Sequence, residues 1–234
     1  MSDLLSALAI ALSLIDRLDA TLVQTVRLSM AVSLLAVVTA SLIGLPLGAV
    51  VALGRFPGCT AVKVMLNAFM GLPPVVVGLV VYIALSRSGP LGSFGLLFTP
   101  TAMVIAQTIL VLPIVMALAR QVVEDLWEEY SEQLRSLGAE RLVAIPTLLW
   151  DGRYRLATVV LAGFGRAIAE VGTVMIVGGN IAGVTRTMTT SIALETSRGD
   201  LPLALAFGFI LIFLTTLVNA LVYVVGDAAR RGMG

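Results

Sequence analysis

The stretch Glu132-Gln-Leu-Arg-Ser-Leu-Gly138, followed by Ala139-Glu-Arg-Leu-Val-Ala-Ile145, lies inside a charged segment that runs from residue 120 to residue 155. This segment holds 7 of the 14 acidic residues and 5 of the 15 basic residues, although apolar blocks of membrane-spanning length stand on both sides of it. A polar insert of this length indicates a docking surface outside the bilayer. The alternative is a loop whose charges only keep it in water.

Within this segment the sequence predicts a helix, a sharp turn and a second, short helix. Gly138 supplies the turn, because glycine readily adopts the left-handed conformation that ends many helices. The helix before it would present five carboxylates at its start, namely Glu124, Asp125, Glu128, Glu129 and Glu132.

The composition predicts an all-α integral membrane protein. Hydrophobic residues make up 59% and charged residues 12% of the 234-residue chain, and its mean hydropathy is +1.04. Soluble domains carry about 25% charged residues, so this chain has more apolar surface than one soluble core can hide. Helices are expected because a segment in hydrocarbon must satisfy its own backbone hydrogen bonds, and alternating strand patterns are absent.

The residue inventory excludes several kinds of chemistry. The chain has no histidine and a single cysteine, Cys59, so the commonest metal ligand and any internal disulfide are missing. It contains no Gly-x4-Gly-Lys-Ser/Thr loop to bind a nucleotide, and a net charge of +1 without a basic face argues against nucleic acid. We therefore expect a protein that is not an enzyme and that binds no cofactor, metal or nucleic acid itself.

Five apolar blocks are long enough to cross a bilayer, which takes about 20 helical residues. They lie at residues 22–53, 62–86, 96–119, 156–178 and 201–225. An earlier apolar stretch at residues 4–15 is too short, and only Asp3 precedes it, so we expect an interfacial helix within residues 1–21 rather than a signal peptide. The transmembrane domain then covers residues 22–226 with its polar loop at 120–155, and residues 227–234 form a tail.

The distribution of Lys and Arg orients these helices. One set of polar connections carries nine of them, namely Arg55, Lys63, Arg120, Arg135, Arg141, Arg153, Arg155, Arg230 and Arg231. The opposite set carries five, namely Arg17, Arg27, Arg87, Arg186 and Arg198. The positive-inside rule places the first set in the cytoplasm, so the N-terminus is predicted outside and the charged loop and C-terminus inside.

Two features inside the apolar blocks, and a loop outside them, could form a pathway through the membrane. Pro73 and Pro74 lie about 15 Å into the second apolar block at 1.5 Å per residue, where they should kink or unwind the helix. Such a break either lines a pathway or only packs against neighbouring helices. Arg166 and Glu170 are the charges placed well inside a block; their i,i+4 spacing allows a structural ion pair or a role in the pore or gate.

The predicted outer loop after Gly178 is rich in hydrogen-bond donors. It contains Asn180, Thr185, Arg186 and Thr187, and no carboxylate precedes Glu195. Such a loop could accept a tetrahedral dianion, contact an external binding protein, or simply be polar.

Several stretches resemble the permease subunits of ABC importers. Glu132 and Gly138 match the Glu-Ala-Ala loop of these permeases, although Gln133 and Leu134 replace the usual alanines and Asp151 stands where proline is common. The other similar stretches are Gly71-Leu-Pro-Pro-Val-Val-Val-Gly78, Ser86-Arg-Ser-Gly-Pro-Leu-Gly92, Phe98-Thr-Pro-Thr-Ala-Met103, Gly165-Arg-Ala-Ile-Ala-Glu-Val-Gly172, Gly178-Gly-Asn-Ile181 and Thr185-Arg-Thr-Met-Thr-Thr190. Together they resemble the tungstate-type permeases, relatives of the molybdate and sulfate permeases, over residues 22–226.

This resemblance implies a type I importer permease in the inner membrane of a prokaryote. Two copies of the chain would form a pathway for an oxyanion, which an extracytoplasmic binding protein delivers. The resemblance indicates tungstate, with molybdate, sulfate or another oxyanion as the alternative. Two ATPase subunits, which bind ATP and Mg, would drive transport by binding to the loop around Glu132, Gln133, Gly138 and Ala139. Lipid surrounds the remaining surface.

Two rival functions follow from the composition. An ion-coupled secondary carrier usually needs carboxylates within the membrane, and only Glu170 qualifies. A membrane-embedded enzyme would need a catalytic constellation that a chain without histidine does not offer.

Overall fold

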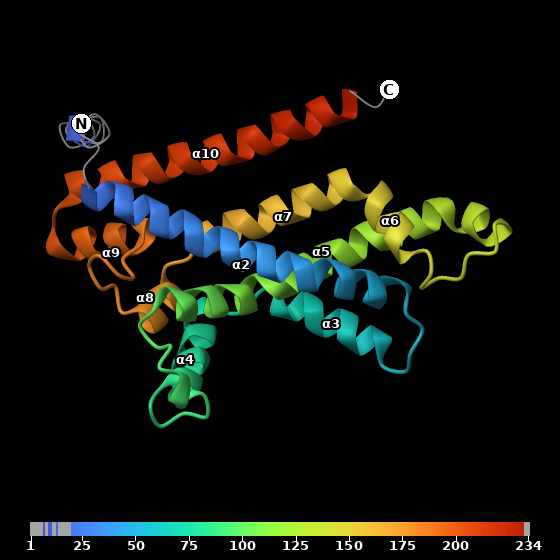
Figure 1. Ribbon diagram of the computed structural model, residues 1–234, viewed down its shortest axis with the longest axis horizontal. Helices are drawn as coiled ribbons and strands as arrows, with labels where there is room; N and C mark the ends of the chain where they lie inside the picture. Colours follow the sequence, from blue (N-terminus) through green and yellow to red (C-terminus); the bar gives the residue numbers. More distant parts are fainter. Residues whose placement is uncertain (1–6, 8, 11–12, 14–19, 232–234) are drawn as a thin grey trace.

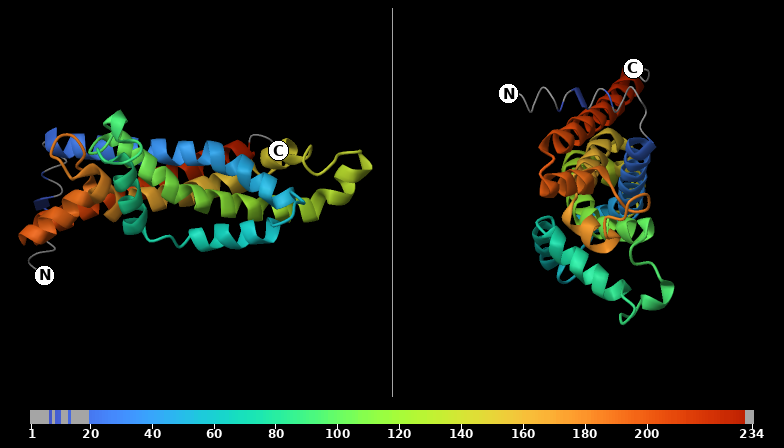
Figure 2. Two further views of the ribbon diagram at one scale, coloured as in Figure 1. Left: turned by 90° about the horizontal axis from the view of Figure 1, so that it is seen from below. Right: turned by 90° about the vertical axis from the view of Figure 1, so that its left-hand side faces the viewer.

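The regular structure of the chain is helical throughout the part that the computed structural model describes, residues 7, 9–10, 13 and 20–231 (Figure 1). The elements are α2 (Ala20–Leu53), α3 (Cys59–Phe69), α4 (Pro74–Leu85), the 3-10 turn η1 (Gly92–Phe94), α5 (Pro100–Ser136), α6 (Ile145–Asp151), α7 (Arg153–Ile168), α8 (Gly172–Gly178), α9 (Met188–Arg198) and α10 (Leu201–Arg231). Helices α2, α5, α7 and α10 run along the long axis of the molecule, whereas α4 stands across it (Figures 1 and 2). This arrangement confirms the expected all-helical class.

Three described helices are each long and apolar enough to cross a membrane, namely α2, α5 and residues 201–221 of α10. Two further pairs pass the same test together, but α3 and α4 are bent by 101° and α7 and α8 by 60°. The described part therefore contains three such spans, or up to five if each bent pair counts as one. The interfacial helix expected within residues 1–21 lies for the most part outside the described residues, as do residues 232–234 of the expected tail.

Helix α5 extends further than the hydropathy pattern indicates. The apolar block ends near residue 119, but the helix continues without a break through Ser136. The reason is local, because neither glycine nor proline occurs between Pro113 and Gly138, and Arg120 pairs with Glu124 one turn later at 2.5 Å. The first half of the charged segment is therefore a rigid helical extension, and a short loop at residues 138–144 connects it to α6.

Helices α2 and α5 pack closely because α2 carries small residues on the facing side. A Cβ atom added to Gly44 would lie 3.0 Å from Cγ1 of Val115, and one added to Gly48 would lie 2.6 Å from the carbonyl oxygen of Met116. Small residues spaced four apart allow membrane helices to approach backbone to backbone. The opposite side of α2 exposes large apolar side chains such as Leu35 (56%) and Leu42 (72%), which suits contact with lipid or another apolar surface.

Candidate functional site

The long helix α5 ends in a turn at Gly138. Gly138 has a φ of 78°, its N–H donates to the carbonyl of Arg135, and the N–H of Ala139 donates to the carbonyl of Leu134, both over 2.9 Å. This pair of hydrogen bonds closes the helix as glycine-based caps do. Glu132 and Gln133 lie exposed on the last turn before it.

On both sides of this turn the segment exposes apolar side chains to solvent. Leu137 is 82% exposed, Leu142 56% and Val143 69%. A hollow of about 300 Å³ lies between α5 and α6 beside them, and its lining includes Gln133 and Trp150. Exposed apolar side chains beside a concave surface are typical of a place where another protein binds.

The two helix bends meet each other. Pro73 precedes α4 with an extended backbone, and Pro74 is the first residue of α4, where its missing N–H does no harm. The hydroxyl of Thr173, in α8, donates to the carbonyl oxygen of Pro74 over 2.7 Å. A Cβ added to Gly78 would lie 2.9 Å from the Cα of Thr173, so α4 and α8 also touch backbone to backbone.

Arg166 and Glu170 form an ion pair at the second bend. Nη1 of Arg166 lies 2.7 Å from Oε2 of Glu170, and the side chain of Glu170 is 4% exposed while that of Arg166 is 32% exposed. The other carboxylate oxygen accepts a hydrogen bond from the N–H of Thr173 over 2.9 Å, and the carbonyl of Glu170 accepts one from the hydroxyl of Thr189 over 2.9 Å. Glu170 thus ties α7, α8 and α9 together, and the guanidinium is the more open member of the pair.

In the outer loop, two of the four expected donors are used within the protein. Thr185 is fully buried, donating to the carbonyl of Gly178 over 2.6 Å and accepting from the N–H of Ile181 over 2.9 Å. Thr187 is also buried and caps α9 in a reciprocal arrangement with Thr190. Asn180 and Arg186 are partly exposed and contact each other at 3.4 Å. The loop therefore offers fewer free hydroxyls than its composition indicates.

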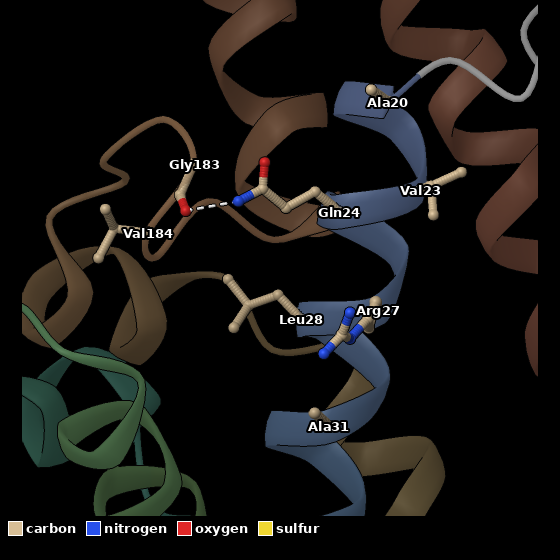
Figure 3. Close-up of a pocket in the computed structure, with 8 residues that line it drawn as sticks. All are labelled: Ala20, Val23, Gln24, Arg27, Leu28, Ala31, Gly183 and Val184. Carbon is tan, nitrogen blue, oxygen red and sulfur yellow. Dashed lines mark hydrogen bonds between the residues drawn. The ribbon is translucent and has the colours of Figure 1, made fainter.

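A wide hollow of about 870 Å³ lies between this loop and the first turns of α2. Figure 3 shows Gln24 reaching across it to the carbonyl of Gly183, over 2.6 Å, with Arg27 one turn further along α2. Arg27 is exposed and forms no ion pair within the described part of the chain. Our sequence reasoning treated Arg27 only as a marker of orientation.

Gln107 is a further polar residue that the sequence reasoning missed. It is 3% exposed, its amide donates to the carbonyl of Ala167 over 3.1 Å, and its Oε1 has no hydrogen-bond partner among the described residues. A cavity of about 10 Å³, lined also by Ser33 and Glu170, adjoins it. An isolated glutamine within an apolar block was the signal that could have identified this polar cluster.

A second charged cluster lies between α3 and α5. Glu124 lies 2.6 Å from Nζ of Lys63 and 2.5 Å from Nη1 of Arg120. The carboxylate joins α3 to α5, so the first half of the first bent pair is fixed to the long helix. Arg120 is 8% exposed, and its Nε has no partner among the described residues.

Comparison with known proteins identifies relatives over most of the chain. Residues 44–232 match the family described as "binding-protein-dependent transport system inner membrane component". The tungstate uptake system permease protein TupB of Peptoclostridium acidaminophilum is 40% identical over 213 residues, which cover 91% of this chain and 93% of that protein. A probable anion ABC transporter permease protein of Haloferax volcanii is 41% identical over 86% of this chain and 88% of its own length. A sulfate transport system permease protein, CysW, of Synechocystis is 29% identical over 73% of this chain and 64% of its own length.

Proposed function

Because this chain belongs to the family of binding-protein-dependent transport system inner membrane components, we propose that it is the permease subunit of an ATP-driven importer of tungstate. The choice of tungstate as the transported anion rests on the 40% identity to a tungstate uptake permease over 91% of the chain. The Haloferax relative, described only as an anion permease at 41% identity, favours another oxyanion as the second candidate. The resemblance drawn from the sequence is confirmed, and the chain is an inner-membrane protein.

Within the membrane we propose five spans, with the N-terminus outside and the C-terminus in the cytoplasm. Helices α2, α5 and α10 would be three of them, and the bent pairs α3–α4 and α7–α8 the other two. The excess of Lys and Arg at one end supports this orientation. Residues 1–21 would lie along the outer interface, residues 22–226 would form the transmembrane domain, and residues 227–234 a cytoplasmic tail.

We propose that the ATPase subunits dock at the end of α5 and the following turn. Three features support this role. Glu132 and Gln133 are exposed on the last turn of α5, and Gly138, which precedes Ala139, has a positive φ. Leu142 and Val143 are exposed after the turn. A rigid helix that runs from the outer side through to the docking point can transmit a displacement along its whole length. ATP and Mg would bind to the ATPases and not to this chain.

A second copy of the chain would complete the pathway, and an extracytoplasmic binding protein would deliver the anion. The exposed apolar side chains of α4, including Val76 (52%), Leu79 (51%) and Val80 (61%), are available to a second copy because α4 stands away from the bundle. Asn180 and Arg186 would face the binding protein or its cargo, while Thr185 and Thr187 shape the loop that holds them.

The pathway itself would pass the two bends. Pro73 and Pro74 open one helix, and the more exposed guanidinium of Arg166 lies at the other. Its charge is partly neutralised by Glu170, which favours weak and reversible contact with a passing dianion. Tight binding would belong to the delivery protein, so that this chain releases its cargo quickly.

The decisive experiment is uptake into proteoliposomes that contain the chain together with its ATPase and binding protein. Tungstate accumulated inside is measured by mass spectrometry, with molybdate and sulfate as competitors. Uptake that requires ATP, Mg and the ATPase supports the proposal. Equal accumulation without the ATPase would instead support a secondary carrier, and accumulation of molybdate or sulfate in preference to tungstate would assign the other oxyanion as cargo.

A further inference from the structure

Trp127 is buried at a place where the surrounding sequence is charged. It lies in the extension of α5 between Leu126 and Glu128, yet its side chain is only 7% exposed. It belongs to a buried cluster with contributions from three elements. These are Ala49 and Leu53 from α2, Val123 and Leu126 from α5, and Ala144 and Leu148 from the start of α6. One indole therefore joins the inner ends of two long helices to the chain that returns after the Gly138 turn.

Two guanidinium groups lie against this indole. The Cζ atom of Arg135 is 5.7 Å from the ring centroid, and that of Arg141 is 5.3 Å from it. Arg135 precedes Gly138 and Arg141 follows it, so the two cations bridge the turn through one aromatic ring. Contacts of a cation with the face of an indole are attractive because of the ring quadrupole.

Arg141 lies close to two other positive charges, which repel it. Partial burial and the positive charges of Arg55 and Arg135 lower the pKa of the Arg141 guanidinium below its ordinary value. Among the described residues no ion pair includes any of these three arginines. The aromatic ring is thus the attractive partner that keeps Arg141 beside two like charges.

The geometry has a mechanical consequence. A glycine in a turn is the natural pivot of a segment, and a Cβ at Gly138 would meet nothing within 4 Å, so packing does not hold the turn in place. Rotation about Gly138 would instead separate Arg141 from the indole and Ala144 from the cluster around it. The contacts of Trp127 with Arg141 and with the cluster around Ala144 therefore oppose a rotation of the docking segment that leaves the membrane helices in place.

We propose that Trp127, together with Arg135 and Arg141, is a rigid joint that makes residues 132–144 move as one body with the inner ends of α2 and α5. This inference rests on the proposed docking of ATPases at that segment. Trp127 acts here as a positioning residue, because its buried side chain packs against residues of this chain. Its removal should loosen the link between ATP hydrolysis and transport while the assembled complex persists.

The test compares Trp127→Leu with Trp127→Phe in proteoliposomes that contain the ATPase and the binding protein. Phenylalanine keeps an aromatic face for the two cations, whereas leucine keeps only apolar volume. We expect the amount of tungstate imported per ATP hydrolysed to fall about threefold or more with leucine and to stay near the parental ratio with phenylalanine. Hydrogen exchange at the amides of Ala139 and Ala144, which donate over 2.9 and 3.1 Å, should rise in the leucine variant alone.

Arg141→Gln provides a second variant that leaves the buried indole in place, so it also serves if Trp127→Leu fails to assemble. Its matched control is Arg153→Gln, because Arg153 lies 5.1 Å from the ring of Trp150, an indole that is 73% exposed. The joint predicts a lower transport ratio for Arg141→Gln than for Arg153→Gln. Parental ratios in both Trp127→Leu and Arg141→Gln, or in Arg141→Gln alone where Trp127→Leu does not assemble, would overturn the joint. A parental protein that shows no ATP-dependent uptake would overturn the proposed function itself.

Discussion

The hydroxyl of Thr173 donates a hydrogen bond of 2.7 Å to the carbonyl oxygen of Pro74, a residue 99 positions earlier in the chain. This bond joins the bend between α3 and α4 to the bend between α7 and α8. Both bends free backbone groups that a continuous helix would have paired, and inside a membrane such groups need partners from elsewhere in the protein. The hydroxyl of Thr173 therefore links the two bends directly, so the two are expected to move together.

Removing this hydrogen bond should destabilise the protein. Thr173 is fully buried, so Thr173→Val keeps the shape of the side chain but removes the hydroxyl that donates to the carbonyl of Pro74. We expect a loss of about 1 kcal/mol of stability, measured as the free energy of unfolding in mild detergent. Thr173→Ser retains the hydroxyl and is the control. Equal stability of the valine and serine variants would show that the bond contributes nothing.

A substitution that forces α4 away from α8 should impair uptake. In Gly78→Ala the added Cβ would lie 2.9 Å from the Cα of Thr173, a backbone atom that cannot rotate away. Overpacking of this kind costs about 1–3 kcal/mol, so we expect reduced thermal stability and slower tungstate uptake. Gly165→Ala is the matched control, because a Cβ there meets nothing within 4 Å. If both variants behave like the parent, the close contact of the two half-helices is unimportant.

The ion pair at the second bend should matter for assembly more than for affinity. Arg166→Ala leaves the carboxylate of Glu170, 4% exposed, without its cation. Breaking a buried pair destabilises strongly, and because the guanidinium is partly exposed we expect about 2 kcal/mol here. The yield of assembled complex on size-exclusion chromatography should fall, while the apparent KM for tungstate changes little. A complex of normal yield that no longer moves the anion would contradict a mainly structural pair.

The Gly138 turn should be needed for coupling. Its φ of 78° is unfavourable for any residue with a Cβ, and a tryptophan there would also cover the docking segment. We expect Gly138→Trp to insert into the membrane normally but to lose ATP-dependent uptake, and Glu132→Ala to reduce it. Gly58→Trp is the control, since Gly58 has a φ of 88° and open space around it but lies in the α2–α3 turn. Unchanged uptake in Gly138→Trp would remove the docking role.

Much of the local structure follows from the sequence. The membrane class, the positions of the apolar blocks, the turn at Gly138 and the interruption at Pro73 and Pro74 depend on hydropathy and on the backbone preferences of glycine and proline. The pairing of Arg166 with Glu170 follows from their spacing on one helical face. The length of α5 was underestimated, because hydropathy reports where lipid ends and not where a helix ends.

Some of the candidate site could not be found in this way. Thr185 and Thr187 were read as free donors, but their hydroxyls close the outer loop on itself. Trp127 and Gln107 gave no periodic signal, since each is a single residue whose burial depends on segments far away in the sequence. The type of a residue tells which hydrogen bonds or ion pairs it can form, but not which partner it finds in the folded protein.

The amino-acid sequence by itself determined that this chain is a membrane protein and where its apolar blocks lie, because these depend on the free energy of moving each residue from water to lipid. Only the tertiary structure decided that the carbonyl of Pro74 meets the hydroxyl of Thr173 and that one indole holds two arginines across a turn. Those contacts depend on how whole helices pack, and packing depends on the close fit of many side chains at once.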